Sequence, residues 1–219
     1  LELGENAVGI IAGTEEFSQE VLNRLRGLKV ISRVGVGLEN VDLKTARLLG
    51  IKIYNTPDAV SESVAELTVA LILDLLRKVT ALSHSLKSGR WNKEMGLLLE
   101  NKKVGLIGFG RIGRRVSELL APFRCQISFY DPRPDCEATT AAAKSSLEAL
   151  LRDSDIVSLH ANVEPASRPL LTENEFRTIK KGCFLINTAR GSLIDEKALF
   201  QALERGHLQG AALDVFANE

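Results

Sequence analysis

The chain has 219 residues, of which 45% are hydrophobic and 26% are charged, and 28 basic residues balance 28 acidic ones. This length permits one large domain or two smaller ones, and the composition is ordinary for a globular protein. A net charge of zero gives no general attraction for nucleic acid or for an anionic membrane, so we expect neither as a partner.

The three cysteines, Cys125, Cys136 and Cys183, lie far apart and form no CxxC pair. Their odd number and low density argue against a disulfide framework and against a zinc site, so we expect no metal. No secretory leader is recognisable at the N-terminus, and the most apolar predicted helix, 64–79, is interrupted by two acidic residues. We therefore expect a cytoplasmic protein.

Short apolar runs alternate with helical patterns along the whole chain. The predicted strands are 8–11, 30–31, 51–54, 104–107, 127–130, 156–159, 184–186 and 211–215. The predicted helices are 18–25, 43–49, 64–78, 112–120, 147–152 and 196–205. Such alternation is typical of βαβ units, so we predict an α/β fold with a mostly parallel sheet and helices on both of its faces.

The strands fall into two groups. The first three end before Pro57, and Ser61 is predicted to cap the long helix that follows. A polar stretch at 87–101 then precedes the second group of strands. We predict two domains, residues 1–60 and 61–219, joined by the helix after Pro57.

A glycine-rich turn, Gly-Phe-Gly-Arg-Ile-Gly at 108–113, directly follows strand 104–107 and leads into a helix. Gly108 permits a tight turn, Gly110 lets the backbone approach a pyrophosphate, and Gly113 lets helix and strand pack closely. The N–H groups at the helix start then hold the anion. The bare pattern is equally typical of an ordinary loop, so its context decides.

Asp131 ends the next strand, 18 residues beyond Gly113, where an acid accepts hydrogen bonds from the adenosine ribose. Alone, it is as typical of a turn before Pro132. Together with the glycines it predicts a dinucleotide site, and a carboxylate would repel a 2′-phosphate, which favours NAD over NADP. Arg133 opposes that preference, because a basic side chain can accommodate the phosphate.

Arg190 follows strand 184–186, and Asp214 lies near the end of the last predicted strand. Ligands of open α/β sheets bind outside the carboxyl ends of the strands, so Arg190 is expected near the nicotinamide. Its guanidinium can bind a substrate carboxylate through two hydrogen bonds and polarise the neighbouring carbonyl. A surface ion pair with Asp195 or Glu196 is the alternative that the spacing also permits.

The motifs GFGRIG, YDP, NTARGSLIDEKAL and GAALDVF, in this order and spacing, resemble the D-isomer-specific 2-hydroxyacid dehydrogenases. Upstream, SRVGVGLENVDL and YNTPDAVSESVAELTVALIL are similar to the substrate-domain loop and the interdomain helix of that family. The resemblance spans nearly the whole chain and is strongest toward the D-3-phosphoglycerate dehydrogenase branch. It implies a Rossmann-type NAD-binding domain and a smaller, incomplete flavodoxin-like substrate domain.

The same resemblance implies hydride transfer between NAD and a D-2-hydroxy acid or its 2-keto acid. Arg190 and Glu219 would be catalytic, with Glu219 supporting a histidine. The substrate would meet Arg190 and the loop residues Val34, Gly35 and Gly37. The implied cofactor contacts are Val36, Gly108, Gly110, Arg111, Ile112, Gly113, Asp131, Ala161, Thr188, Ala189, Arg190 and Asp214. The family commonly has a proline where this sequence has Asn162, so the adenine side departs from the pattern.

Reduction of a ketone by hydride also needs a proton donor, and histidine suits neutral pH. In the family this histidine comes after the glutamate, beyond Glu219, and we expect structural or solvated roles for His84, His160 and His207. The substrate domain also begins later than is usual. We therefore expect a fragment of a longer enzyme that is inactive as given.

The alternative from another functional class is a catalytically incomplete NAD-binding regulatory or interaction protein, because fold does not fix function. Retention of Arg190 and Glu219 favours the enzyme. The upstream motifs disfavour a Rossmann enzyme with an unrelated substrate. The apolar helix 64–79, with Trp91 after it, resembles the dimer-forming region of the family, so we expect a homodimer; an ordinary interdomain core helix is the alternative.

Overall fold

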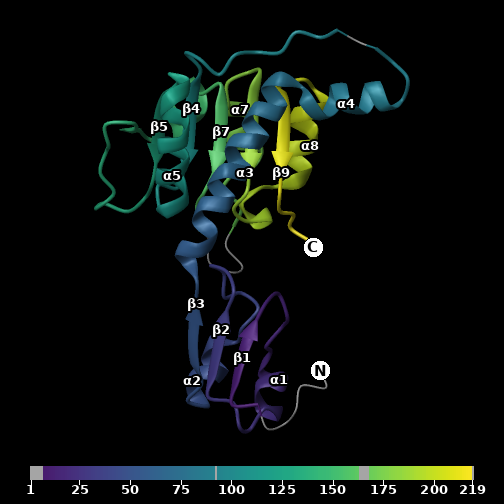
Figure 1. Cartoon of the computed structure of the whole chain (residues 1–219). Helices are drawn as coiled ribbons and strands as arrows, with labels where there is room; N and C mark the ends of the chain where they lie inside the picture. The colour runs from purple at the N-terminus through teal and green to yellow at the C-terminus, as the bar shows by residue number, and fades with distance from the viewer. Residues whose placement is uncertain (1–6, 92, 163–167, 219) are drawn as a thin grey trace. The chain divides into compact units, whose positions relative to one another are not determined.

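The computed structural model describes residues 7–91, 93–162 and 168–218. The chain divides into two compact units, Leu1–Ser61 and Glu62–Glu219 (Figure 1). Each unit has its own parallel sheet and its own hydrophobic core.

The small unit is a three-stranded parallel sheet in the order β1-β2-β3 with two short helices. Its elements are β1 (Gly9–Ala12), α1 (Gln19–Arg24), β2 (Val30–Arg33), α2 (Leu43–Leu48) and β3 (Lys52–Asn55). Ser18 and Asp42 cap the helices, since their side chains accept N–H groups of the first turn. Phe17, Leu22 and Ile31 are fully buried in its core.

The large unit is a six-stranded sheet in the order β6-β5-β4-β7-β8-β9, with every pairing parallel. Helix α3 (Pro57–Arg77) leads into it. The elements that follow are α4 (Val79–Lys87), β4 (Lys103–Ile107), α5 (Arg111–Leu120), β5 (Gln126–Tyr130), β6 (Ala143–Lys144), α6 (Leu147–Asp153), β7 (Ile156–Leu159), α7 (Glu173–Thr178), β8 (Cys183–Asn187), α8 (Glu196–Glu204) and β9 (Leu208–Leu213). The strand order therefore reverses between β4 and β7. Ligands of open α/β sheets bind at the carboxyl ends of the strands at such a point.

Helices cover both faces of the large sheet (Figure 1). On one face, Ile72 and Leu76 of α3 and Val116 of α5 pack on alternate residues of the strands. On the other, α6, α7 and α8 pack on the residues between, such as Leu159 and Leu185. Burial on both faces explains why these strands read as continuous apolar runs. The predicted α/β class is confirmed.

Two boundaries differ from the sequence prediction by three residues or more. Helix α3 begins at Pro57, so Ser61 lies inside the helix, where its hydroxyl donates to the Pro57 carbonyl at 2.8 Å. Proline suits the first helical position because its φ is preset and no N–H is needed there. The last strand is Leu208–Leu213 rather than 211–215, because its pairing with β8 begins at Leu208. The short elements α4, β6 and α7 were not predicted.

Candidate functional site

The glycine turn, residues 108–113, directly follows the carboxyl end of β4. Gly108 has φ +92°, a conformation that L-residues rarely adopt, and its N–H donates to the Tyr130 carbonyl at 2.8 Å. A Cβ on Gly108 would lie 2.5 Å from the backbone nitrogen of Ala161. The turn therefore lies against the segment after β7 at a distance that only glycine allows.

The start of α5 is open to a ligand. Gly110 is its N-cap and offers no side chain to the first N–H groups, and a Cβ on Gly110 would meet nothing within 4 Å. At Gly113, a Cβ would overlap the Gly108 carbonyl oxygen, so helix and turn are packed closely. Arg111 and Ile112 occupy the first turn of the helix. The N–H groups of this turn and the positive end of the helix suit a pyrophosphate.

Asp131 follows β5 and is only 6% exposed. Its carboxylate accepts the Phe109 N–H at 2.8 Å, which ties it to the glycine turn. It also accepts the backbone N–H of Arg133 at 3.0 Å and two guanidinium bonds of 2.8 Å from the same residue. The Arg133 guanidinium is the main reason that the pKa of Asp131 lies far below its usual range. The carboxylate is therefore ionised at neutral pH.

His160 and Ala161 directly follow β7, beside the turn. The His160 N–H donates to the Ile107 carbonyl at 2.7 Å, and its Nε2 lies 3.0 Å from the Ser158 hydroxyl. Its Nδ1 is buried and has no hydrogen-bond partner among the described residues. Burial lowers the pKa of His160 to about 4, so the ring is neutral at pH 7.

We expect His160 to make the protein acid-sensitive. Its pKa is about 4 when folded against an ordinary value of 6.5, so on acidification the unfolded chain binds the proton first. The folded protein therefore has its full stability with respect to this group above about pH 6.5, and loses stability as the pH falls toward 4. Between about pH 7 and pH 5 the loss should be roughly 2 kcal/mol. Urea unfolding at both pH values, with His160→Gln as the comparison, measures it; equal losses in the two proteins would contradict the assignment.

Asn187 shapes the loop that carries Arg190. At the end of β8 its buried amide donates to the Arg190 carbonyl at 2.9 Å and accepts the Ala189 N–H at 3.0 Å. The Asp214 N–H donates to the Asn187 carbonyl at 2.9 Å. A Cβ on Gly191 would overlap the carbonyl carbon of Phe216, so the segment after β9 packs directly on this loop. Asn187 thus connects the backbone of the Arg190 loop with that of Asp214 at the carboxyl edge of the sheet.

The two carboxylates of the alternative ion pair, those of Asp195 and Glu196, each accept a backbone N–H. Asp195 caps α8 by accepting the Ala198 N–H at 3.1 Å, and Glu196 accepts the Ala217 N–H at 2.7 Å. The Arg190 guanidinium donates to the Ala189 carbonyl at 2.7 Å, and the residue is half-buried.

Thr188 is held by a residue that the sequence did not single out. The hydroxyls of Thr188 and Thr68, a buried residue of α3, lie 2.9 Å apart. Because Thr68 donates its one proton to the Val64 carbonyl at 2.8 Å, Thr188 must be the donor to Thr68. The lone pairs of Thr188 therefore remain to accept a hydrogen bond.

Replacing Asn187 by alanine should destabilise the protein by about 1–2 kcal/mol, since the half-buried Ala189 N–H and Arg190 C=O lose their partner. The exposed Asn174 of α7 is the matched control, and Asn174→Ala should change the unfolding free energy by less than about 0.5 kcal/mol. Chemical unfolding of both variants tests this. Similar small changes in the two would show that the Asn187 amide does not hold the loop.

The loop predicted to bind the substrate follows β2 in the small unit. The Val34 N–H donates to the Ala12 carbonyl at 2.8 Å and the Gly35 N–H to the Thr56 hydroxyl at 3.0 Å. The N–H groups of Val34 and Gly35 therefore already have acceptors within the chain. Val36 and Gly37 retain N–H groups without an acceptor in the described part of the chain.

Glu219 is outside the described residues. His84 lies exposed on α4. His207 precedes β9, at the amino edge of the sheet, as expected, and its Nε2 lies 2.7 Å from the Ile179 carbonyl oxygen.

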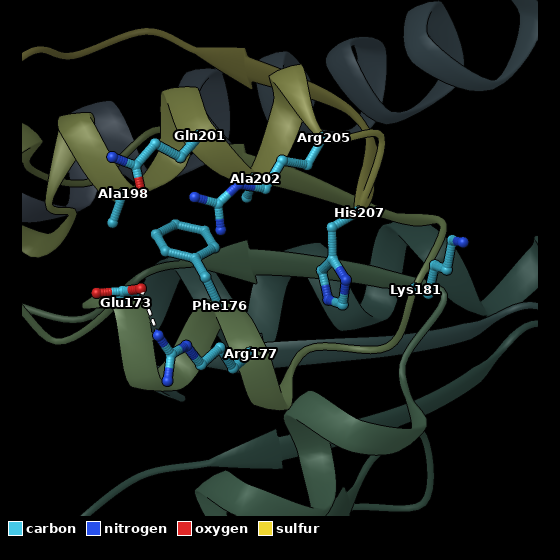
Figure 2. A pocket seen from close by; sticks show the side chains of 9 residues that line it. All are labelled: Glu173, Phe176, Arg177, Lys181, Ala198, Gln201, Ala202, Arg205 and His207. Carbon is cyan, nitrogen blue, oxygen red and sulfur yellow. Dashed lines mark hydrogen bonds and ion pairs between the residues drawn. The ribbon is translucent and has the colours of Figure 1, made fainter.

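A hollow of about 290 Å³ lies beside His207, between α7 and α8 (Figure 2). Phe176 forms part of its wall, and Arg177, paired with Glu173 at 2.6 Å, and Arg205 border it. These arginines stand at the carbonyl ends of the two helices, where positive charge compensates the helix dipole. An anion in the hollow would also face the carbonyl groups at the ends of α7 and α8. We therefore assign the hollow no binding role.

No helix within residues 7–91, 93–162 and 168–218 is long and apolar enough to cross a membrane. Those residues also contain no group of three or more side chains placed to hold a metal ion.

The strand order, the glycine turn after β4 and the carboxylate after β5 define a Rossmann-type dinucleotide-binding domain. Residues 69–219 match the model of the family described as D-isomer specific 2-hydroxyacid dehydrogenase, NAD binding domain. The chain belongs to this family. The predicted family and the predicted cofactor, NAD, are confirmed.

Named relatives agree with this assignment. The chain is 37% identical to D-3-phosphoglycerate dehydrogenase of Homo sapiens over 214 residues, which cover 96% of the chain and 40% of that protein. It is 36% identical to hydroxypyruvate reductase of Thermotoga maritima, over 96% of the chain and 69% of that protein. The crystal structure of the TT0316 protein from Thermus thermophilus has a TM-score of 0.88 and 38% identity, and the match covers 97% of this chain and 69% of that one. The chain thus spans 40% of the length of its phosphoglycerate dehydrogenase relative.

Proposed function

We propose that the protein is an NAD-dependent oxidoreductase that interconverts a D-2-hydroxy acid and its 2-keto acid, with 3-phosphoglycerate as the first substrate to test. The observation that supports this most is that Asn187 holds the loop of Arg190 and the Asp214 backbone at the carboxyl edge of the sheet that carries the glycine turn. A guanidinium at that edge suits a carboxylate substrate.

The cofactor would be held mainly by backbone groups. The turn from Gly108 to Gly113, with Arg111 and Ile112, binds the pyrophosphate, and Asp131 accepts the ribose hydroxyls. Ala161 lies by the adenine, and Thr188, Ala189 and Asp214 lie by the nicotinamide. When bound, NAD supplies the acceptor of the hydride, and NADH supplies its donor.

The substrate would be oriented by charge. Arg190 binds the carboxylate with two parallel hydrogen bonds and polarises the adjacent carbonyl. We assign residues 1–60 as the substrate domain, where Val36 and Gly37 supply backbone donors. Glu219 is proposed to orient the histidine that exchanges the proton and to keep its pKa high.

Titration with NADH, followed by its own fluorescence, tests the cofactor site first. Assays of the full-length protein, which includes the histidine expected after Glu219, with NAD and D-3-phosphoglycerate, and with NADH and hydroxypyruvate, then test the chemistry. Turnover with a D-2-hydroxy acid and none with its L-isomer is the expected result. Tight NADH binding without turnover of any 2-hydroxy or 2-keto acid would overturn the oxidoreductase and favour a regulatory NAD-binding protein.

We also propose a cytoplasmic homodimer. Apolar side chains gather on α4 and the segment after it, where Leu86 is 58%, Trp91 79%, Met95 89% and Leu98 65% exposed. Leu86 and Trp91 also line part of a hollow of about 380 Å³. A second copy of the chain is the occupant that we assign to this surface, since exposed apolar patches of this kind mark interfaces. The three free cysteines suit a reducing compartment.

Light scattering over a range of concentrations measures the self-association. We expect twice the chain mass of 23.9 kDa for the unchanged protein and a single chain for the double variant Trp91→Ser, Met95→Ser. Phe200→Ser is the control, because Phe200 is 63% exposed on α8, away from these residues in sequence. A monomer in every case would contradict the proposal.

A further inference from the structure

The geometry points to Arg133 as a specificity-determining residue. Its guanidinium leaves Asp131 when the ribose of the cofactor binds there, and this reduces the preference for NADH over NADPH. This inference rests on the nucleotide site proposed above. It concerns what Arg133 does when the adenosine half of the cofactor arrives.

The acceptor capacity of Asp131 is already in use. A carboxylate offers about four lone-pair positions. One oxygen accepts the Phe109 N–H and one guanidinium nitrogen of Arg133, both at 2.8 Å. The other accepts the backbone N–H of Arg133 at 3.0 Å and its Nε at 2.8 Å. Two ribose hydroxyls can therefore donate to this carboxylate only if two of the four bonds are released.

The two side-chain bonds are the ones free to break. The Phe109 bond belongs to the glycine turn, and the backbone of Arg133 is restricted by Pro132 and Pro134 on either side of it. By contrast, the Arg133 side chain is 57% exposed, so its guanidinium can move into water. The ribose hydroxyls would replace the guanidinium on a carboxylate whose backbone bonds stay intact.

This exchange has opposite effects on the two cofactors. NADH must displace a charge-assisted pair, so Arg133 weakens its binding. NADPH carries a 2′-phosphate that Asp131 alone would repel, and the displaced guanidinium is at hand to pair with it. Arg133 therefore favours NADPH relative to NADH, in the opposite direction to the neighbouring acid, Asp131.

Other charges near the loop are mixed in sign. Lys144 of β6 donates to the carbonyls of Cys136 at 2.9 Å and Arg133 at 3.4 Å, which anchors the loop and adds a second cation. Asp135, exposed on the same loop, adds an acid. The guanidinium of Arg133 is the group that contacts the carboxylate directly.

The test is the ratio of dissociation constants for NADPH and NADH, measured by cofactor fluorescence in the unchanged chain and in Arg133→Met. We expect the ratio to rise about tenfold or more, with NADPH bound more weakly and NADH equally or more tightly. Arg152→Met is the matched control: Arg152 is 61% exposed and pairs with Glu148 at 2.8 Å on α6, so the ratio should stay unchanged. Titration with 2′-AMP and 5′-AMP repeats the comparison on the adenosine half alone.

If Arg133 only stabilises the loop, Arg133→Met should have a lower melting temperature and an unchanged ratio of the NADPH and NADH dissociation constants. That result would overturn the inference. An equal loss of affinity for both cofactors would overturn it as well. If the unchanged chain binds neither cofactor, the nucleotide site itself is wrong and the exchange fails with it. Normal NADH binding with an unchanged ratio refutes the exchange alone.

Discussion

Replacing Gly110 by aspartate should abolish NADH binding while leaving the protein at least as stable as before. A Cβ at this position meets nothing within 4 Å, and the backbone, at φ −81° and ψ −154°, suits any residue. Aspartate is among the best N-cap residues, so its carboxylate should bind the first N–H groups of α5 and stabilise the helix by about 0.5–1 kcal/mol. The same carboxylate occupies and repels the place of the pyrophosphate, so we expect the dissociation constant for NADH to rise by at least about a hundredfold.

Thermal unfolding and NADH titration of the same preparation measure both effects. Gly113→Ala is the informative comparison, because its Cβ would overlap the Gly108 carbonyl oxygen and should lower stability as well as binding. Retained NADH affinity in the Gly110→Asp variant would show that the pyrophosphate does not bind at the start of α5.

Replacing Arg190 by glutamine should lower kcat/KM for the 2-keto acid by about a thousandfold in the active enzyme, while the dissociation constant for NADH changes less than about threefold. Glutamine removes the charge and the paired donors but keeps a polar side chain. Arg190→Lys keeps the charge without the planar fork, so we expect an intermediate loss. Steady-state kinetics and NADH titration separate the two effects.

Arg205→Gln is the control for Arg190, since Arg205 follows α8 at the amino edge of the sheet. It should leave both quantities unchanged. A similar loss in both variants, or full activity without Arg190, would remove Arg190 from the substrate site.

The sequence predicted the parts of the site that are determined locally. Strand, glycine turn and helix at 104–113 follow each other directly. Gly108 has a conformational requirement and Gly113 a packing requirement, as their positions in the motif predict. Asp131 could be placed because the end of β5 was correctly predicted. The predicted start of α3 was wrong because Ser61 resembles an N-cap residue. Inside a helix a serine can instead donate to the carbonyl four residues earlier, as Ser61 does.

Other features depend on contacts between distant residues. The start of β9 is decided by its pairing with β8, and Thr68 meets Thr188 across 120 residues of chain. Asn187 carried a local signal, because asparagine often bonds to the backbone two residues ahead, as it does with the Ala189 N–H. The bonds of Arg133 to Asp131 also depend on the side-chain conformation, which the two-residue spacing leaves open.

Trp91, the one tryptophan of the chain, is 79% exposed on the segment that follows α4. The protein thus carries a built-in optical probe on the surface that we assign to a second copy. Indole emission moves to shorter wavelengths when water is removed from the ring, so the emission maximum should follow assembly as the protein is concentrated. A change in that maximum on adding nucleotide would then report altered packing of the apolar surface.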